Sequence, residues 1–150
     1  MLTSDYRDML SALSNAEVDC LVVGAFALAA HGNPRATGDM DIYIRPELSN
    51  AERLMKALGE FGAPVSKISI DDFLKLDTDY QIGISPCRID LLTGLDGIEN
   101  FEDAWVDHIV ASVDGIHIPV LSRRALIQNK KCLARPQDIA DVAWLEANPE

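Results

Sequence analysis

The stretch from Val22 to Ile44 places the strongest constraint on the fold. Residues 18–23 are rich in β-branched side chains and end at Gly24, which predicts a buried strand followed by a sharp turn. Residues 25–30 predict a short helix, and residues 39–44 alternate between polar and apolar side chains, as expected for a strand with one buried face. Strand, helix and strand in succession restrict the chain to folds that combine helices with a sheet.

The remaining pattern continues this alternation. Further helices are predicted at residues 4–15, about 49–61, 122–134 and 136–148, capped by Ser4, by Ser49 or Asn50, and by Ser122, with a helical turn over 71–76. Further strands are predicted at 65–70, 80–84, 88–92, 109–113 and 116–120, the last two joined as a hairpin at Asp114-Gly115, with Pro119 marking an edge strand. We expect an α/β or α+β fold, with a mixed sheet, a late hairpin and two closing helices, in a single domain spanning residues 1–150.

Composition excludes several classes of protein. A formal charge of -11 argues against binding of bulk duplex nucleic acid, although Lys and Arg cluster late in the chain. The three cysteines are odd in number and widely spaced, which favours free thiols and a cytoplasmic location. No apolar run approaches the roughly 20 residues that span a bilayer, so we expect no membrane association.

Asp39 and Asp41 are the first candidates for chemistry. Side chains two apart on a strand point the same way, so these carboxylates repel each other unless a cation or solvent intervenes. Carboxylate oxygens suit Mg²⁺, which also binds substrate phosphates. The alternative is a solvated strand end, where acidic pairs are common, and we assign Asp77-Thr78-Asp79 to that class as part of a polar loop.

Asp90 interrupts the otherwise apolar strand Ile89-Asp90-Leu91-Leu92. A carboxylate in such a strand needs a partner or a function. A third acid beside two others suits a metal site, or a base that deprotonates an attacking hydroxyl. A salt bridge between Asp90 and Arg88 explains the same residue equally well.

Four other positions, Gly24, Ala25, Arg35 and Thr37, are candidates for binding an anion, and Lys130 is a cation whose place on its helix is informative. Gly24 and Ala25 open a helix after a strand, where backbone N–H groups can bind phosphate, although a plain turn has the same pattern. Arg35 and Thr37 precede the acids and are either phosphate contacts or surface loop residues. Lys130 is four residues from Leu126 and three from Leu133, so it lies on or beside the inward stripe of its helix.

Together these segments resemble the DNA polymerase β-like nucleotidyltransferase superfamily, which has a Gly-Gly or Gly-Ser turn, an acid-x-acid pair and a third acid on a nearby strand. The matching segments are Val23-Gly24-Ala25, residues 37–42 and Ile89-Asp90-Leu91. The run over residues 31–41 and the tail segments 128–130, 135–138 and 141–142 resemble a small bacterial branch related to AbiEii-type abortive-infection toxins. The resemblance extends over residues 18–146.

This resemblance implies roles for individual residues. Asp39 and Asp41 would bind Mg²⁺ (or Mn²⁺) and a nucleoside triphosphate, and Asp90 would complete the metal site and activate the acceptor hydroxyl. Gly24 and Ala25 would hold phosphate through backbone N–H groups. The nucleotide would also be contacted by Lys130 and Arg135. Ala25 departs from the family, which has Gly or Ser at that position.

We therefore expect an enzyme that transfers a nucleoside monophosphate (NMP) from a nucleoside triphosphate (NTP) to a hydroxyl of a small molecule, protein or RNA. The resemblance places it in a toxin–antitoxin or phage-defence setting, with an antitoxin or a second copy of the chain as candidate partner. A catalytically weak or inactive nucleotide-binding module of the same fold is the main alternative. A structural protein with accidental acids is the third.

Overall fold

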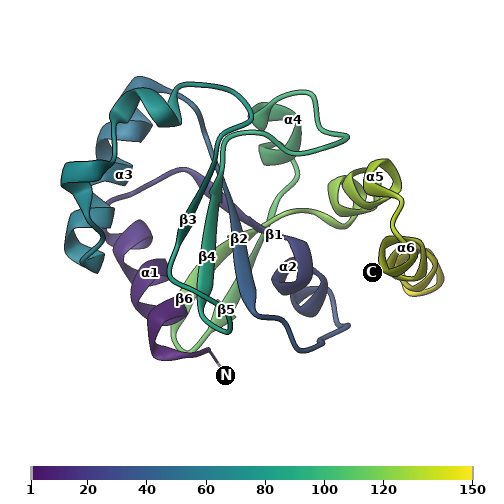
Figure 1. Ribbon diagram of the computed structural model, residues 1–150. Coiled ribbons are helices and arrows are strands. Elements are labelled where there is room, and N and C mark those ends of the chain that lie inside the picture. The colour runs from purple at the N-terminus through teal and green to yellow at the C-terminus, as the bar shows by residue number, and fades with distance from the viewer. Residues whose placement is uncertain (1, 150) are drawn as a thin grey trace.

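Six strands form one mixed sheet at the centre of the computed structural model, which describes residues 2–149 (Figure 1). Met1 and Glu150, the ends of the expected domain, lie outside the described residues. The strand order is β3-β4-β2-β1-β6-β5, with β2/β4 and β1/β6 parallel and the other pairs antiparallel. The strands are β1 (Cys20–Val23), β2 (Asp39–Ile44), β3 (Asp79–Ile82), β4 (Arg88–Leu92), β5 (Ile109–Val113) and β6 (Ile116–Val120). The expected mixed α/β fold is confirmed.

Helices cover both faces of the sheet. Helices α1 (Ser4–Asn15) and α3 (Leu48–Phe61) pack side by side on one face, and α2 (Gly24–Ala30) covers the other (Figure 1). The closing helices α5 (Arg123–Leu133) and α6 (Pro136–Ala147) pack against each other on the α2 side. No helix within residues 2–149 is long and apolar enough to cross a membrane.

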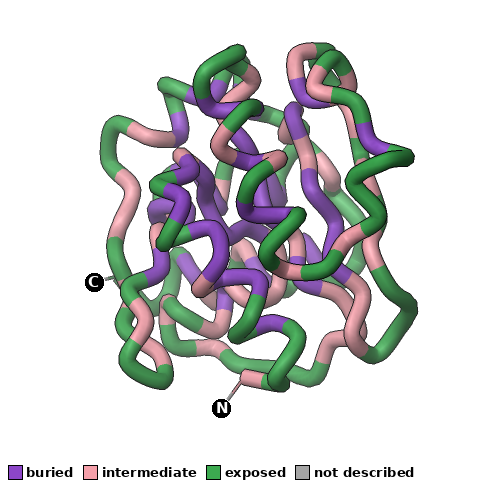
Figure 2. Tube along the Cα trace, turned by 90° about the vertical axis from the view of Figure 1, so that its left-hand side faces the viewer, coloured by how far each residue is buried: buried purple, intermediate pink, exposed green. Residues whose placement is uncertain are grey.

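The core sets the direction in which the two acids of β2 point. Met40, Ile42 and Ile44 alternate with the two acids and are almost completely buried. Figure 2 views the molecule from the α1 and α3 side, with buried chain inside and exposed chain outside. Because successive side chains of a strand point to opposite faces, burial of these three apolar residues turns Asp39 and Asp41 toward α2.

Several predicted bounds match the structure. Strands β2 and β4 and both hairpin strands begin and end where the sequence placed them, and positive φ angles of 52° at Asp114 and 80° at Gly115 fit the two-residue turn. Ser122 caps α5, since its Oγ accepts a hydrogen bond from the Ala125 N–H over 3.1 Å. Helix α1 is capped by Thr3 rather than Ser4.

The strand predicted at residues 65–70 is wrong. Two 3₁₀ helices, η1 (Val65–Lys67) and η2 (Ile70–Phe73), occupy this region. The Ser69 N–H donates to Asp72 Oδ2 over 3.3 Å and the Asp71 N–H donates to Ser69 Oγ over 3.2 Å. These bonds pair backbone N–H groups with side chains of the same turn. The same N–H groups are then not available to pair with a neighbouring strand.

The cap predicted for α3 at Ser49 or Asn50 is also wrong. The helix begins at Leu48 with Glu47 as its N-cap residue. Asn50 is buried and links the residue before β1 to the residue after β2 instead, because its Oδ1 accepts from the Asp19 N–H over 2.7 Å and its Nδ2 donates to the Arg45 carbonyl over 2.9 Å. The Asn50 side chain, which local spacing assigned to the helix cap, is therefore engaged in tertiary hydrogen bonds.

Pro119 does not lie on an edge strand, because β6 runs between β5 and β1. Its pairing with β1 is restricted to Val22 and Val120, so Pro119 is not required to donate a hydrogen bond there. The short helix α4 (Phe101–Trp105) was not predicted; Asn100 caps it by accepting from the Asp103 N–H over 3.0 Å.

Candidate functional site

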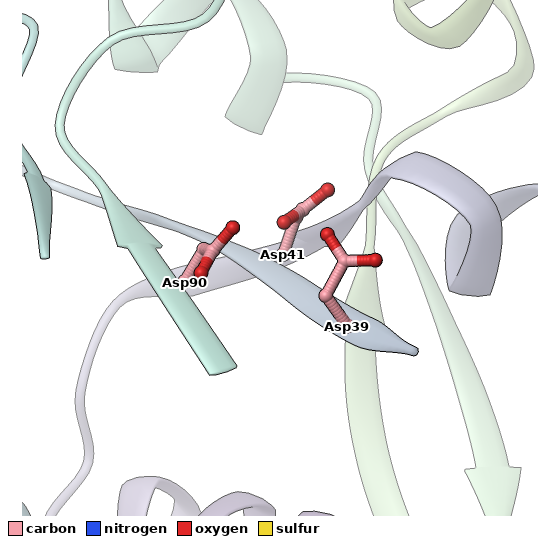
Figure 3. A group of neighbouring side chains, drawn as sticks. All are labelled: Asp39, Asp41 and Asp90. Atoms are coloured by element: carbon pink, nitrogen blue, oxygen red, sulfur yellow. The ribbon is translucent and has the colours of Figure 1, made fainter. Parts of the chain in front are cut away.

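Three carboxylates meet where β2 and β4 lie side by side. The two strands pair in parallel with Asp41 opposite Asp90 and Asp39 opposite Arg88. Figure 3 shows Asp39, Asp41 and Asp90 on the same side of these strands. One oxygen from each carboxylate lies within 4.8 Å of the others. The structure therefore brings together the three acids that the sequence singled out, in an arrangement able to hold a metal ion.

Arg88 contacts two of these acids. Its Nη2 donates to Asp90 Oδ2 over 3.2 Å and to Asp39 Oδ2 over 3.4 Å. Its Nε lies 3.1 Å from Asp90 Oδ1, but the two atoms do not have hydrogen-bond geometry. The alternative raised for Asp90, an ion pair with Arg88, is therefore present together with the acid cluster.

The hydrogen bonding of Asp90 is a second observation that fits a divalent cation at the three acids. Asp90 Oδ1 is buried and has no hydrogen-bond partner among residues 2–149. A buried carboxylate oxygen whose close cation, Arg88 Nε, is misaligned for a hydrogen bond is costly, and carboxylate oxygens are the ligands that Mg²⁺ and Mn²⁺ prefer. Asp39, Asp41 and Asp90 would hold such an ion.

Asp41 has a strongly altered acidity. Burial, and then the negative charges of Asp39 and Asp90, raise the pKa of Asp41 to about 7. In the absence of a cation, this carboxyl therefore retains a proton well above the ordinary range of aspartate. A divalent ion among the three acids would favour the fully ionised form.

Gly24 allows the start of α2 to approach the acids. Its φ is +66°, a value that side chains other than glycine rarely adopt, and an added Cβ would lie 2.8 Å from Asp41 Oδ2. Gly24 and Ala25 both line the cleft above the acids. The glycine that the sequence marked as a turn is thus required by both conformation and space.

The cleft has a volume of about 470 Å³ and lies between the sheet and the closing helices. All nine residues predicted for the site line it: Gly24, Ala25, Arg35, Thr37, Asp39, Asp41, Asp90, Lys130 and Arg135. Thr37 supports the acids directly, since its hydroxyl lies 3.1 Å from Asp39 Oδ1. The roles of these residues remain predictions; their proximity is a feature of the fold.

Asp79 also lines the cleft and was missed. The sequence assigned it to a polar loop, but it opens β3, one residue before the predicted start at Tyr80. Burial and the Asp90 charge raise its pKa, although Arg88 partly opposes them. Placing the strand one residue earlier would have put Asp79 on the sheet. Asn129 and Gln137 also line the cleft; they lie in the tail segments that carry the resemblance but were not singled out as site residues.

Lys130 faces inward as its spacing predicted, and only 3% of its side chain is exposed. Its Nζ lies 2.9 Å from Asp141 Oδ2 and 3.5 Å from Asp138 Oδ1, both on α6. Asp141 also accepts from Arg35 Nη1, over 2.7 Å. Two predicted nucleotide contacts are therefore already paired with one carboxylate behind the cleft.

Arg135 is paired in the same way. Its Nε donates to Asp138 Oδ2 over 2.6 Å, and its backbone N–H donates to the same oxygen over 3.2 Å. Burial raises the pKa of Asp138, but the hydrogen bonds and charge of Arg135, with the charge of Lys130, outweigh it and hold that pKa below its usual value. Asp138 is thus an anion that fixes two cations at the cleft.

No protein-family model matches the chain, and no curated protein matches its sequence. Solved structures do match. A Thermotoga maritima protein, provisionally assigned as a nucleotidyltransferase, is 20% identical with a TM-score of 0.64, covering 98% of this chain and 96% of its own. This chain has a nucleotidyltransferase-like fold.

A second match has the same fold. An antigenic nucleotidyltransferase-like protein from Paracoccidioides brasiliensis is 17% identical with a TM-score of 0.53, covering 94% of this chain and 74% of its own. At these identities the likeness establishes the fold alone. Assignment to the AbiEii-related bacterial branch stays a prediction.

Proposed function

We propose that the protein is a metal-dependent nucleotidyltransferase, which transfers an NMP from an NTP to an acceptor hydroxyl. One observation carries this proposal: three acids and three cations, Arg35, Lys130 and Arg135, line the same cleft from different elements of the fold. An acid cluster alone is common on protein surfaces. Acids that fit a divalent cation, beside basic groups that fit phosphate, match the two requirements of a metal-bound triphosphate.

The names of the two similar structures support the same class of reaction. A bound Mg²⁺ or Mn²⁺ would neutralise charge that develops on the phosphates. Asp39 and Asp41 would hold that ion, and Thr37 would keep Asp39 in position through its contact of 3.1 Å. Arg35, Lys130 and Arg135 would orient the triphosphate.

Asp90 would serve the acceptor as well as the metal. Its carboxylate lies beside Asp39 and Asp41 and lines the cleft, so it would accept the proton of an acceptor hydroxyl bound there. The hydroxyl oxygen would then bond to the α-phosphorus, the bond between that phosphorus and the bridging oxygen would break, and pyrophosphate would leave with that oxygen. Ala25 would contribute its backbone N–H, which does not depend on the missing hydroxyl of a serine.

A catalytically weak nucleotide-binding module is the second candidate. Arg88 already contacts Asp39 and Asp90, and the three cations of the cleft are already paired with α6. These ion pairs neutralise charges of the cleft within the protein itself. Such a cleft suits a sensor or interaction module that binds a nucleotide without turnover. An AbiEii-related defence role, with an antitoxin or a second copy as partner, belongs with either candidate.

Incubation with labelled NTP, Mg²⁺ and candidate acceptors tests the proposal and separates the two functions. The acceptors are the protein itself, RNA and small hydroxyl compounds. We expect Mg²⁺-dependent transfer that Asp39→Asn and Asp41→Asn abolish, while Asp71→Asn, at an exposed acid outside the cleft, does not change it. Binding of NTP without transfer would favour the module, and equal labelling in all variants would overturn the enzyme.

A further inference from the structure

Asp141 of α6 joins two cations that come from distant parts of the chain. Its Oδ1 accepts from Arg35 Nη1 over 2.7 Å, and its Oδ2 lies 2.9 Å from Lys130 Nζ. Arg35 belongs to the loop between α2 and β2, whereas Lys130 belongs to α5. One carboxylate therefore links the loop that precedes the acids to the closing helices.

The acids of α6 lie behind the cations and not in the cleft. Arg35, Lys130 and Arg135 line the cleft, but neither Asp138 nor Asp141 does. The Asp138 side chain is fully buried and the Asp141 side chain is 5% exposed. The two carboxylates thus hold from the protein side three basic residues that line the space where a ligand would bind.

Burial makes this arrangement necessary for Lys130. An ammonium with 3% of its side chain exposed can stay charged only beside counter-charges. Asp141 and Asp138 supply them, at 2.9 Å and 3.5 Å. Without Asp141, Lys130 would lose its shorter contact and the Arg35 guanidinium would lose its anchor.

The balance of charge leaves a surplus for an anion. Arg35, Lys130 and Arg135 carry three positive charges, and Asp138 and Asp141 carry two negative charges, so the group has a net charge of +1. The surplus lies across the cleft from Asp39, Asp41 and Asp90. The acids would hold a divalent ion and the basic residues would bind phosphate oxygens, so a metal-bound phosphate chain would suit both groups.

We propose that Asp141 is a positioning residue for the triphosphate: by holding Arg35 and Lys130 in one geometry, it preorganises the cationic wall before the nucleotide binds. This rests on the proposed function. A preorganised cation pair loses less conformational freedom on binding than two mobile side chains, so the effect belongs to phosphate affinity and not to the metal site.

Calorimetric titration tests this with Asp141→Asn, which keeps the shape of the side chain and removes its charge. The ligands are a non-hydrolysable NTP analogue with Mg²⁺, and Mn²⁺ alone. We expect the affinity for the analogue to fall about tenfold and the affinity for Mn²⁺ alone to stay at the wild-type value. Glu146→Gln is the matched control, because it removes an exposed ion pair of 3.3 Å with Lys131 between the same two helices.

A double-mutant cycle with Arg35→Met adds a readout that a purely structural role would not move. If Asp141 acts through Arg35, the two substitutions together weaken binding by less than the product of their separate effects. Additive effects, or a folded Asp141→Asn variant with wild-type affinity for the analogue, would overturn the proposal. A wild-type protein that binds no analogue would instead contradict the proposed function itself.

Asp141→Glu covers the case in which Asp141→Asn does not fold. It keeps a counter-charge for Lys130 but moves the carboxylate by one methylene and displaces the 2.7 Å contact with Arg35. We expect weaker binding of the analogue and unchanged binding of Mn²⁺ alone. Wild-type affinity for the analogue in this variant would also overturn the positioning role.

Discussion

Gly24 lies so close to the Asp41 carboxylate that a Cβ at position 24 would come within 2.8 Å of Asp41 Oδ2. The backbone at the start of α2 and the central acid of the cluster therefore occupy positions that exclude any side chain between them. Since φ at Gly24 is also +66°, two independent constraints act on this one residue.

Substitution Gly24→Ala should lower stability and also disable the acid cluster. The positive φ costs about 1–2 kcal/mol for a residue with a Cβ. The clash would in addition move Asp41 away from Asp39 and Asp90. We expect a lower melting temperature without metal and no further rise on adding Mg²⁺, measured by thermal unfolding in EDTA and in Mg²⁺.

Gly62→Ala is the matched control for this substitution. Gly62 has a φ of +97°, and a Cβ there would meet no atom within 4 Å. It should show the backbone strain but keep the wild-type response to Mg²⁺. A Gly24→Ala protein with a normal Mg²⁺ response would show that close approach at this residue is unimportant for the acids.

The acidity of Asp41 predicts the pH dependence of the metal-free protein. Its pKa is about 7 in the folded state against an ordinary value of 3.8, so the folded state binds this proton more tightly than the unfolded state. The stabilisation is complete below the ordinary pKa and is lost as the pH rises through about 7. The free energy of unfolding should therefore fall with rising pH across this window.

Urea denaturation across that window, in EDTA, measures the effect. Asp41→Asn cannot ionise, so the difference between wild type and variant isolates this group, with a slope of at most about 1.4 kcal/mol per pH unit. In Mg²⁺ the stabilisation by metal should be larger at about pH 8 than at about pH 5, because ligands must be deprotonated. Parallel curves for wild type and Asp41→Asn would refute the assignment.

Arg88 should compete with a metal ion for the same oxygens. Its guanidinium contacts Asp39 Oδ2 and Asp90 Oδ2, so Arg88→Gln leaves those carboxylates without their counter-charge. We expect a lower melting temperature in EDTA and a larger gain on adding Mg²⁺ than in wild type. Arg88→Lys retains the charge and should lie between the two, and a smaller Mg²⁺ gain in Arg88→Gln would mean that Arg88 supports metal binding.

Cysteine reactivity offers a test of the core. Burial, with a smaller effect of the Asp19 charge, raises the pKa of Cys20 to about 12, whereas Cys132 is exposed. In the folded protein at neutral pH, a thiol reagent should modify Cys132 rapidly and leave Cys20 intact until denaturant is added. Mass spectrometry of labelled peptides distinguishes the two, and rapid modification of Cys20 without denaturant would contradict its burial.

The sequence predicted the local parts of the site better than the contacts between them. Alternation in residues 39–44 correctly placed Asp39 and Asp41 on one face, and helical spacing correctly turned Lys130 inward. Both follow from the period of a single element. Caps were less reliable, since the predicted cap Asn50 is engaged in tertiary hydrogen bonds.

The register of distant elements had no such local signal. Asp41 and Asp90 lie opposite each other although they are 49 residues apart in the chain. The sequence does not show which residue of β2 pairs with which residue of β4. The counter-ions of Lys130 lie on the next helix, beyond a left-handed residue at Ala134 with φ 52°, so their approach depends on how α5 and α6 pack. Such relationships arise from tertiary structure and not from residue patterns.

Electron paramagnetic resonance of Mn²⁺ tests most directly whether the three acids hold a metal beside a nucleotide. With a non-hydrolysable NTP analogue present, the wild-type protein should remove the signal of free Mn²⁺, and Asp39→Asn, Asp41→Asn and Asp90→Asn should each restore much of it. Asp71→Asn should behave as wild type. A variant lacking all three acids that still binds Mn²⁺ as tightly as wild type would contradict the metal site and the function built on it.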